Sequence, residues 1–231
     1  MIILDEKDLL KRYFVFFIGL FINSFGVVFV TKANLGNTPI SSIPYILSLG
    51  FAPTLGVFTI LFCLFLIVLQ VVILGKKFEK ASLLQIPVSI AFGYFIDFSM
   101  NLLVWVSPES YVMRFAALAA GCIILGFGVY IEVIADVVML PGEAFVKAVT
   151  CIFYTEFGIT KVCFDATMTI FATILSFVMF SSLRGVGIGT VIAALMVGII
   201  ARCFGRTLAP LARFVLGDSS CKVGQTSVRQ P

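Results

Sequence analysis

The sequence predicts an all-α integral membrane protein with about six transmembrane helices, arranged as two related halves. Hydrophobic residues make up 61% of the chain and charged residues only 12%, whereas a soluble domain carries about 25% charged residues. The apolar residues fall in successive blocks of about 20, the length that crosses ~30 Å of hydrocarbon at ~1.5 Å per residue. The lipid bilayer is therefore the first partner that we expect.

Six segments have the length and hydrophobicity of a membrane-spanning helix. They are 13–31, 55–74, 83–106, 112–134, 162–180 and 186–208. An even number of spans places both termini on one side. If that side is cytoplasmic, all of the 16 basic residues except Lys32, Arg114 and Arg184 lie on the inner side. Because inner loops of membrane proteins are enriched in Lys and Arg, we expect cytoplasmic N- and C-termini.

Two further apolar segments, 39–49 and 141–153, are too short to cross the bilayer. As helices they would extend only ~16 to 20 Å. If they did cross, a basic cluster at Lys76, Lys77 and Lys80 would move to the outside, against the charge rule. We therefore interpret both segments as half-helices that dip into the protein or lie at the membrane interface.

The two halves of the chain match each other without gaps at an offset of 102 residues. Gly19, Phe25, Gly26, Val27, Ala33, Pro39 and Gly56 recur as Gly121, Phe127, Gly128, Val129, Ala135, Pro141 and Gly158. The third helices align only after a small gap, which places Gly93 opposite Gly198. Since each half has three spans, an odd number, the second half must enter the bilayer upside down, and the halves form an inverted repeat.

This repeat divides the chain into four parts. They are a cytoplasmic or interfacial segment at 1–12, a first three-helix repeat at 13–106, a second at 112–208 and a cytoplasmic tail at 209–231. Transporters built from inverted repeats bind their solutes near the membrane midplane, where helices are interrupted at matching positions of the two halves. The half-helices therefore mark the expected site.

Both half-helices begin at a proline, which favours the first helical position. The substrate-binding candidates are Asn37, Thr38, Pro39, Ser41 and Ser42 in the first half, and Pro141, Gly142 and Glu143 in the second. A helix N-terminus presents unpaired N–H groups and a partial positive charge, which suit a polar or anionic ligand. Alternatively, Thr38 and Glu143 satisfy their own helix ends, and the spacing of Glu143 and Lys147 suits an ion pair.

Four acidic residues are candidates for ion or proton coupling. Asp97 and Asp165 lie inside predicted spans, where a charge is costly and faces a cavity or a partner. Glu132 and Asp136 are four residues apart, which predicts two carboxylates on one helix face that share a proton or a cation. Alternatively, these two line a water-filled inner mouth. The chain contains no histidine, so proton coupling would use carboxylates.

Several functional classes are disfavoured. The six cysteines are scattered and show no metal-ligand spacing, so we expect neither a metal site nor a cofactor. We find no pairing of nucleophile and base, and we expect no enzymatic activity. The basic residues are distributed between hydrophobic blocks rather than along one face, which argues against a nucleic-acid partner.

Three short runs resemble motifs of one family. The run from Phe25 to Pro39 is similar to the glycine-rich helix and Leu-Gly-x-x-Pro break of the bacterial YczE/YyaS/YitT membrane proteins. The runs Leu140-Pro-Gly-Glu-Ala-Phe and Arg184-Gly-Val-Gly-Ile-Gly-Thr also resemble this family, and the likeness covers about 13–206. The resemblance implies a bacterial inner-membrane location. It supplies no substrate and no site residues, because the family is largely uncharacterised.

The leading hypothesis is a secondary transporter or exporter of a small solute that binds between the two halves. A passive channel is the first alternative, because half-helices that meet inside a six-span inverted repeat also suit a pore. A membrane partner or assembly protein that transports nothing is the second. The sequence does not identify the solute, the direction of movement, the coupling ion or any self-association into homo-oligomers.

Overall fold

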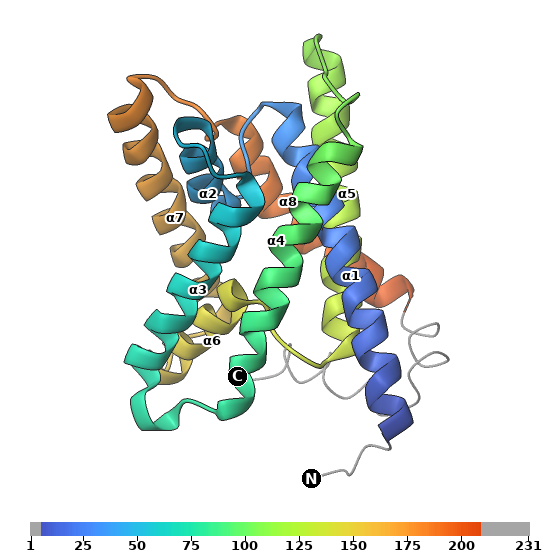
Figure 1. Cartoon of the computed structure of the whole chain (residues 1–231), viewed down its shortest axis with the longest axis vertical. Helices are drawn as coiled ribbons and strands as arrows, with labels where there is room; N and C mark the ends of the chain where they lie inside the picture. Colours follow the sequence, from blue (N-terminus) through green and yellow to red (C-terminus); the bar gives the residue numbers. More distant parts are fainter. Residues whose placement is uncertain (1–5, 209–231) are drawn as a thin grey trace.

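The computed structural model describes residues 6–208, and in this range it contains helices and no strand. The helices are α1 (Glu6–Ala33), α2 (Pro39–Gly50), α3 (Leu55–Leu74), α4 (Gln85–Leu102), α5 (Tyr111–Ala135), α6 (Pro141–Phe153), α7 (Phe157–Phe180) and α8 (Ile188–Thr207). Two short 3-10 turns, η1 (Gly75–Lys77) and η2 (Lys80–Leu84), connect α3 to α4. Figure 1 shows the long helices as one bundle with the short helices α2 and α6 among them.

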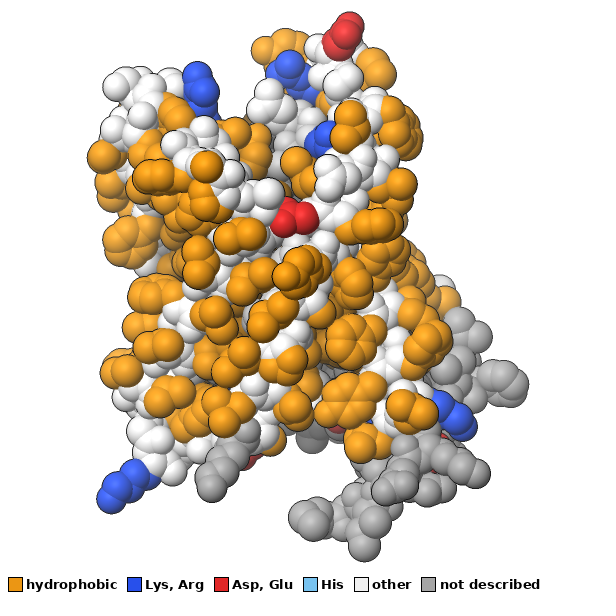
Figure 2. Space-filling view, viewed as in Figure 1, with side chains coloured by type: hydrophobic (Ala, Val, Ile, Leu, Met, Phe, Trp, Pro, Cys, Tyr) orange, Lys and Arg blue, Asp and Glu red, His pale blue; other side chains and the backbone are white. Residues whose placement is uncertain are grey.

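Six helices are long and apolar enough to cross a membrane, which is the number of candidate spans that the sequence predicts. Apolar side chains cover the middle of the face seen in Figure 2, where lipid would contact them. Because α1 begins at Glu6, the described part of the predicted segment 1–12 belongs to α1. Residues 1–5 and the predicted tail 209–231 lie outside the described residues.

The helix boundaries repeat along the chain. The ends of α1 and α5, the first residues of α2 and α6, and the first residues of α3 and α7 are each 102 residues apart. Both short helices begin at the prolines that the sequence analysis identified, Pro39 and Pro141. Equivalent long helices run in opposite directions in Figure 1, since α1 rises from the N-terminus while α5 descends.

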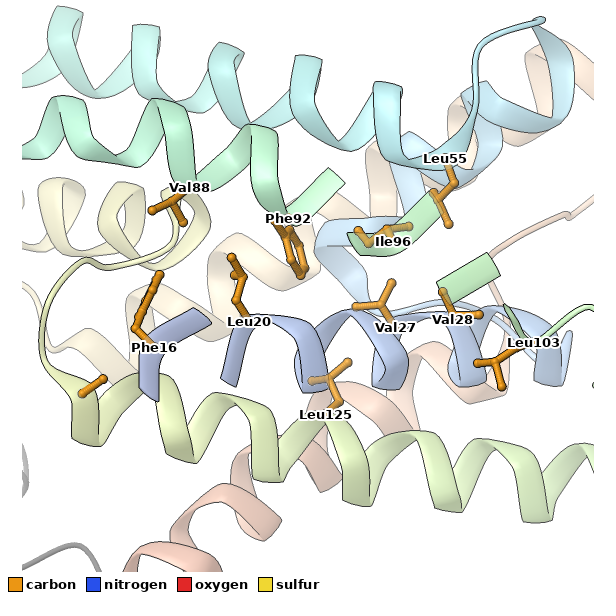
Figure 3. Packing of buried hydrophobic residues seen from close by; sticks show 11 residues of the cluster. Phe16, Leu20, Val27, Val28, Leu55, Val88, Phe92, Ile96, Leu103 and Leu125 are labelled. Carbon is orange, nitrogen blue, oxygen red and sulfur yellow. The ribbon is translucent and has the colours of Figure 1, made fainter. Parts of the chain in front are cut away.

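The central contact is between α1 and α5. Gly26 lies directly against Leu125, and Gly128 lies directly against Asn23, so a Cβ atom at either glycine would collide with the opposite backbone. Small residues let membrane helices approach this closely. The largest apolar cluster extends from this pair to α4, where Phe92 packs towards Leu20 and the other side chains of Figure 3.

Each half-helix packs against helices of both halves. The helix α2 contacts α7 as well as α3, and α6 contacts α3 as well as α7. The two halves differ in how their last two helices pack. In the first half α3 packs along α4, whereas in the second half α7 has no comparable packing with α8 among the described residues. Each half-helix is therefore held by α3 and α7, one long helix from each half.

Candidate functional site

The N-termini of the two half-helices meet. Gly142, the second residue of α6, lies against the side chain of Ile40, the second residue of α2, so closely that a Cβ atom would collide with it. These two residues are 102 positions apart, the offset at which the two halves of the sequence match. Two helix N-termini, each with unpaired N–H groups and a partial positive charge, consequently point towards one region.

The start of α2 carries buried polar atoms without partners. Asn37 is 1% exposed and Thr38 is 7% exposed. The Asn37 side-chain oxygen accepts hydrogen bonds from Thr31 Oγ1 at 3.2 Å and from the Thr38 N–H at 3.1 Å. Within the described part of the chain, Asn37 Nδ2 and Thr38 Oγ1 have no hydrogen-bond partner. A buried unpaired polar atom costs about 1–3 kcal/mol, so both atoms favour a polar ligand.

The expected capping role of Thr38 is not observed. Thr38 occupies the N-cap position of α2, but its side chain makes no capping hydrogen bond. The Ser42 hydroxyl donates to the Thr38 carbonyl at 2.8 Å and is used inside the helix, while Ser41 is buried beside it. Of the candidates in the first half, Asn37 and Thr38 therefore carry the fully buried polar atoms that lack a hydrogen-bond partner among the described residues.

The start of α6 is held by two glutamines that the sequence analysis did not single out. Gln70 of α3 donates its side-chain N–H to the Pro141 carbonyl at 3.1 Å, and Gln70 and Gln85 bond each other through their amides. Both glutamines are at most 3% exposed. The sequence did contain a signal for these two residues: each is an amide in or beside an apolar span, and polar side chains in membrane helices form hydrogen bonds across helices.

Glu143 does not form the ion pair with Lys147 that the spacing predicted. Lys147 is exposed, and the nearby ion pair in the described chain joins Lys161 and Asp165 at 2.7 Å. Glu143 is half-buried and lies within electrostatic range of Lys161, Asp165 and Glu132. Three predicted carboxylates and one lysine therefore gather around α6.

Glu132 and Asp136 do not form a pair on one helix face. Glu132 is buried near the end of α5, and its Oε1 accepts a hydrogen bond from Asn23 Nδ2 at 2.9 Å. Asp136 follows the last residue of α5, adopts a left-handed backbone conformation and is exposed. The end of the helix at Ala135 separates the two carboxylates.

Asp97 links α3 to α4. Its carboxylate accepts a hydrogen bond from Thr54 Oγ1 at 2.6 Å and one from the Gly56 N–H at 2.8 Å. A carboxylate is favourable at a helix N-terminus, and Thr54 also caps α3 by accepting from the Val57 N–H. This geometry gives Asp97 a sufficient structural role.

A cavity of about 530 Å³ lies beside this link and approaches the half-helix site. Its lining includes Thr31, Lys32, Tyr45 and Asp97. Thr31 lines this cavity and its hydroxyl donates a hydrogen bond to the Asn37 side chain, so it connects the cavity wall to the N-terminus of α2. The described residues contain no cluster of three His, Cys, Asp or Glu side chains that could hold a metal ion.

Comparison with known proteins identifies one related group. The model of a family of unknown function, DUF6198, matches residues 10–206. No curated protein and no solved structure matches the chain. The family name carries no activity and contains no reference to YczE, YyaS or YitT, so the function must be inferred from geometry.

Proposed function

This chain belongs to DUF6198, a family of unknown function, and we propose that it is a secondary transporter or exporter of a small polar solute. The solute binds between the two halves, where the N-termini of α2 and α6 meet. The observation that carries this proposal is the pair of buried, unpartnered atoms at the first of these N-termini, Asn37 Nδ2 and Thr38 Oγ1. They lie at the start of α2, whose N-terminus meets that of α6, and two helix dipoles favour hydrogen-bond acceptors there.

We propose that residues 13–106 and 112–208 form an inverted repeat around an axis in the membrane plane. Reciprocal contacts between α1 and α5 support this. Gly19 lies against Ile131, and Gly121 lies against Phe29, so each contact is the other one shifted by 102 residues. The same holds for the contacts of Gly26 and Gly128 described above.

Transport would proceed by alternating exposure of this site. In inverted-repeat transporters, one half or bundle rocks against the other around a fixed site. Here α3 is packed on α4, while α7 stands apart from α8. We propose that the second state exchanges these arrangements, so that α7 approaches α8 while α3 separates from α4.

The coupling group in this proposal is Glu132, together with Asp165 and Lys161. Glu132 is buried at the α1–α5 contact, where its carboxylate accepts a hydrogen bond from Asn23. A buried carboxylate in a membrane protein is costly and is a candidate for proton or cation binding. The distribution of basic residues and the resemblance to YczE/YyaS/YitT proteins support a bacterial inner membrane with cytoplasmic termini.

The first test is ligand binding by the purified protein, because a ligand that binds only the folded state raises the melting temperature. A library of metabolites and ions is screened by thermal shift over a range of pH. Thr38→Val is expected to abolish the shift, yet to melt at or above the wild-type temperature without ligand, since it removes an unpaired hydroxyl. The matched control is Thr59→Val, because Thr59 is equally buried and bonds only within α3.

Uptake into vesicles then separates the functional classes. Saturable uptake that depends on a proton or ion gradient, and that is lost in Thr38→Val but kept in Thr59→Val, supports the transporter. Flux that does not saturate and ignores the gradient would indicate a channel. No ligand and no flux would overturn the proposal in favour of a membrane partner or assembly protein.

A further inference from the structure

A second cavity lies where α1 and α7 end and where α5 and α8 begin. Its volume is about 570 Å³, and its lining residues come from four separate segments of the chain. They include Asn34, Tyr45, Tyr111, Arg114 and Arg184. The charged residues in the described lining are the two arginines, so the cavity is positively charged.

We infer that this cavity is a binding site for a small anion that carries a carboxylate or phosphate group. An arginine guanidinium presents a planar fork of N–H donors that matches such groups in a bidentate manner. Two arginines in one concave, partly apolar site raise the local positive potential and concentrate anions there. Tyr45 and Tyr111 also line the cavity, and a tyrosine hydroxyl is a further hydrogen-bond donor.

Arg114 is fixed in place while its outer nitrogens stay available. Its Nε donates to the Pro108 carbonyl at 3.3 Å, and its guanidinium lies 5.6 Å from the centre of the Tyr111 ring. In the described part of the chain, Nη1 and Nη2 have no hydrogen-bond partner. The side chain is thus oriented without being neutralised by a carboxylate.

Arg184 is positioned by its backbone. The Ser176 hydroxyl accepts from the Arg184 N–H at 2.7 Å and donates towards the Ser182 and Arg184 carbonyls, and Ser176 is 0% exposed. The next residue, Gly185, accepts a hydrogen bond from the Asn37 N–H at 2.9 Å. The Arg184 guanidinium lies 5.0 Å from the Phe180 ring centre and within electrostatic range of Tyr45.

The distribution of charge along the chain supports a specific role for these arginines. Of the basic residues, only Lys32, Arg114 and Arg184 are expected on the outer side of the membrane. All three line the two cavities, which share Asn34 and Tyr45 among their lining residues. The three basic residues expected on this side are therefore concentrated around two adjoining cavities.

Neutralisation of a helix end does not account for Arg114. The equivalent residue in the first half is Arg12, which is buried and donates from Nη1 to the carbonyl of Ala135 at the end of α5. By symmetry, Arg114 would bond the carbonyl of Ala33 at the end of α1, but its Nε bonds Pro108 instead. The Arg114 guanidinium therefore does not cap the end of α1 in the way that Arg12 caps the end of α5.

This inference names the chemical class of the solute, and in that respect it rests on the proposed transport function. Anion binding itself does not require transport. The site lies on the side from which a solute would reach Asn37, since Gly36 lines this cavity and Thr31 lines the adjoining one.

The test is a titration of the purified full-length protein with inorganic phosphate and with succinate, at constant ionic strength, followed by thermal shift and calorimetry. We expect binding by the wild type and at least a tenfold loss of affinity in Arg114→Gln and in Arg184→Gln. Arg184 is exposed, so its variant is expected to fold even if Arg114→Gln does not. Arg206→Gln is the matched control, because it removes one exposed charge near the end of α8, outside the cavity.

The same titration in micelles that contain phosphatidylglycerol or phosphatidylcholine separates two sources of the anion. If only phosphatidylglycerol suppresses phosphate binding, the natural ligand is an anionic lipid headgroup; if phosphate binding persists, it is a soluble anion. Either result supports the site. Absence of binding by the wild type, or an equal loss in Arg206→Gln and Arg184→Gln, would overturn it.

Vesicle uptake keeps the two claims apart. Anion binding that depends on Arg184, in a protein without any flux, would sustain the anion site and refute the transporter. If the protein binds neither phosphate nor succinate but shows gradient-driven uptake of an uncharged solute, the transporter is sustained and the anion site is refuted.

Discussion

Equivalent glycines in the two halves of the molecule have different surroundings. In the first half, Gly56 of α3 and Gly93 of α4 are in such close contact that a Cβ atom on either would collide with the other's carbonyl. In the second half, the corresponding Gly158 and Gly198 have no atom of another helix within 4 Å in the described chain. Since the residue types are the same, the difference lies in how the helices are arranged.

This comparison indicates that one helix pair is closed and its counterpart is open. Small residues allow two membrane helices to approach, and they have no such use where the helices stand apart. The glycines of α7 and α8 therefore suit a packing that the second half does not adopt in this structure. The predictions below test whether it is adopted in another state.

The largest effect is expected from leucine at the two equivalent positions of α4 and α8. Gly93→Leu would force a side chain into the carbonyl of Gly56 and the side chain of Ile60. Overpacking costs about 1–3 kcal/mol and more against a backbone, so the melting temperature should fall by several degrees. Gly198→Leu meets open space and should leave the melting temperature unchanged or higher, as leucine favours helices.

Uptake measurements complete this test. If α7 must close on α8 during transport, Gly198→Leu should lower uptake strongly despite its normal stability. Equal losses of stability in both variants, or normal uptake in Gly198→Leu, would remove the argument for two exchanging helix pairs.

A smaller effect concerns the polar pair at the α1–α5 contact. Asn23 donates to Glu132, whereas the equivalent positions in the other half carry Leu125 and Val30. Asn23→Leu alone leaves the Glu132 carboxylate buried without that donor, and we expect a loss of about 1–3 kcal/mol in stability. The double variant Asn23→Leu with Glu132→Val should recover it, because replacing both partners by apolar groups is close to neutral.

The double variant separates stability from coupling. It makes the contact symmetric, and it removes the proposed coupling carboxylate. Thermal melts compare the three proteins, and uptake is measured with and without a proton gradient. A double variant that is stable and still responds to the gradient would exclude Glu132 as the coupling group.

Much of the fold could be predicted because its signals are local. Apolar length determines the six spans, and Pro39 and Pro141 start the half-helices because a proline lacks the N–H that a helix start leaves unpaired. Predictions from residue spacing within one helix were wrong where the helix ends or where a distant segment supplies the neighbouring charge. Asp136 falls after α5 rather than in it, and Glu143 lies within electrostatic range of Lys161, while its sequence neighbour Lys147 is exposed.

The site could be predicted only in part. The sequence indicated Asn37 and Thr38 through the break in the helix, but the contact between Ile40 and Gly142 depends on how two distant segments pack. The clustering of Arg114 and Arg184 likewise depends on the loop that Ser176 holds. No pattern within one helix carries that information.

The smallest effect on stability is expected at the open end of the second half. In the first half, Thr54 and Asp97 connect α3 to α4; the positions that align with them are Glu156, before α7, and Arg202, in α8. Both are exposed here, so Glu156→Gln and Arg202→Gln should change the unfolding free energy by less than about 0.5 kcal/mol.

If α7 closes on α8 in the second state, these side chains would form an ion pair there, and each variant should slow uptake several-fold. The charge exchange Glu156→Arg with Arg202→Glu should restore uptake, because it rebuilds the pair in reverse. Restoration would establish a contact that exists only in the other state, whereas a double variant no better than the single ones would mean that α7 and α8 never meet at this point.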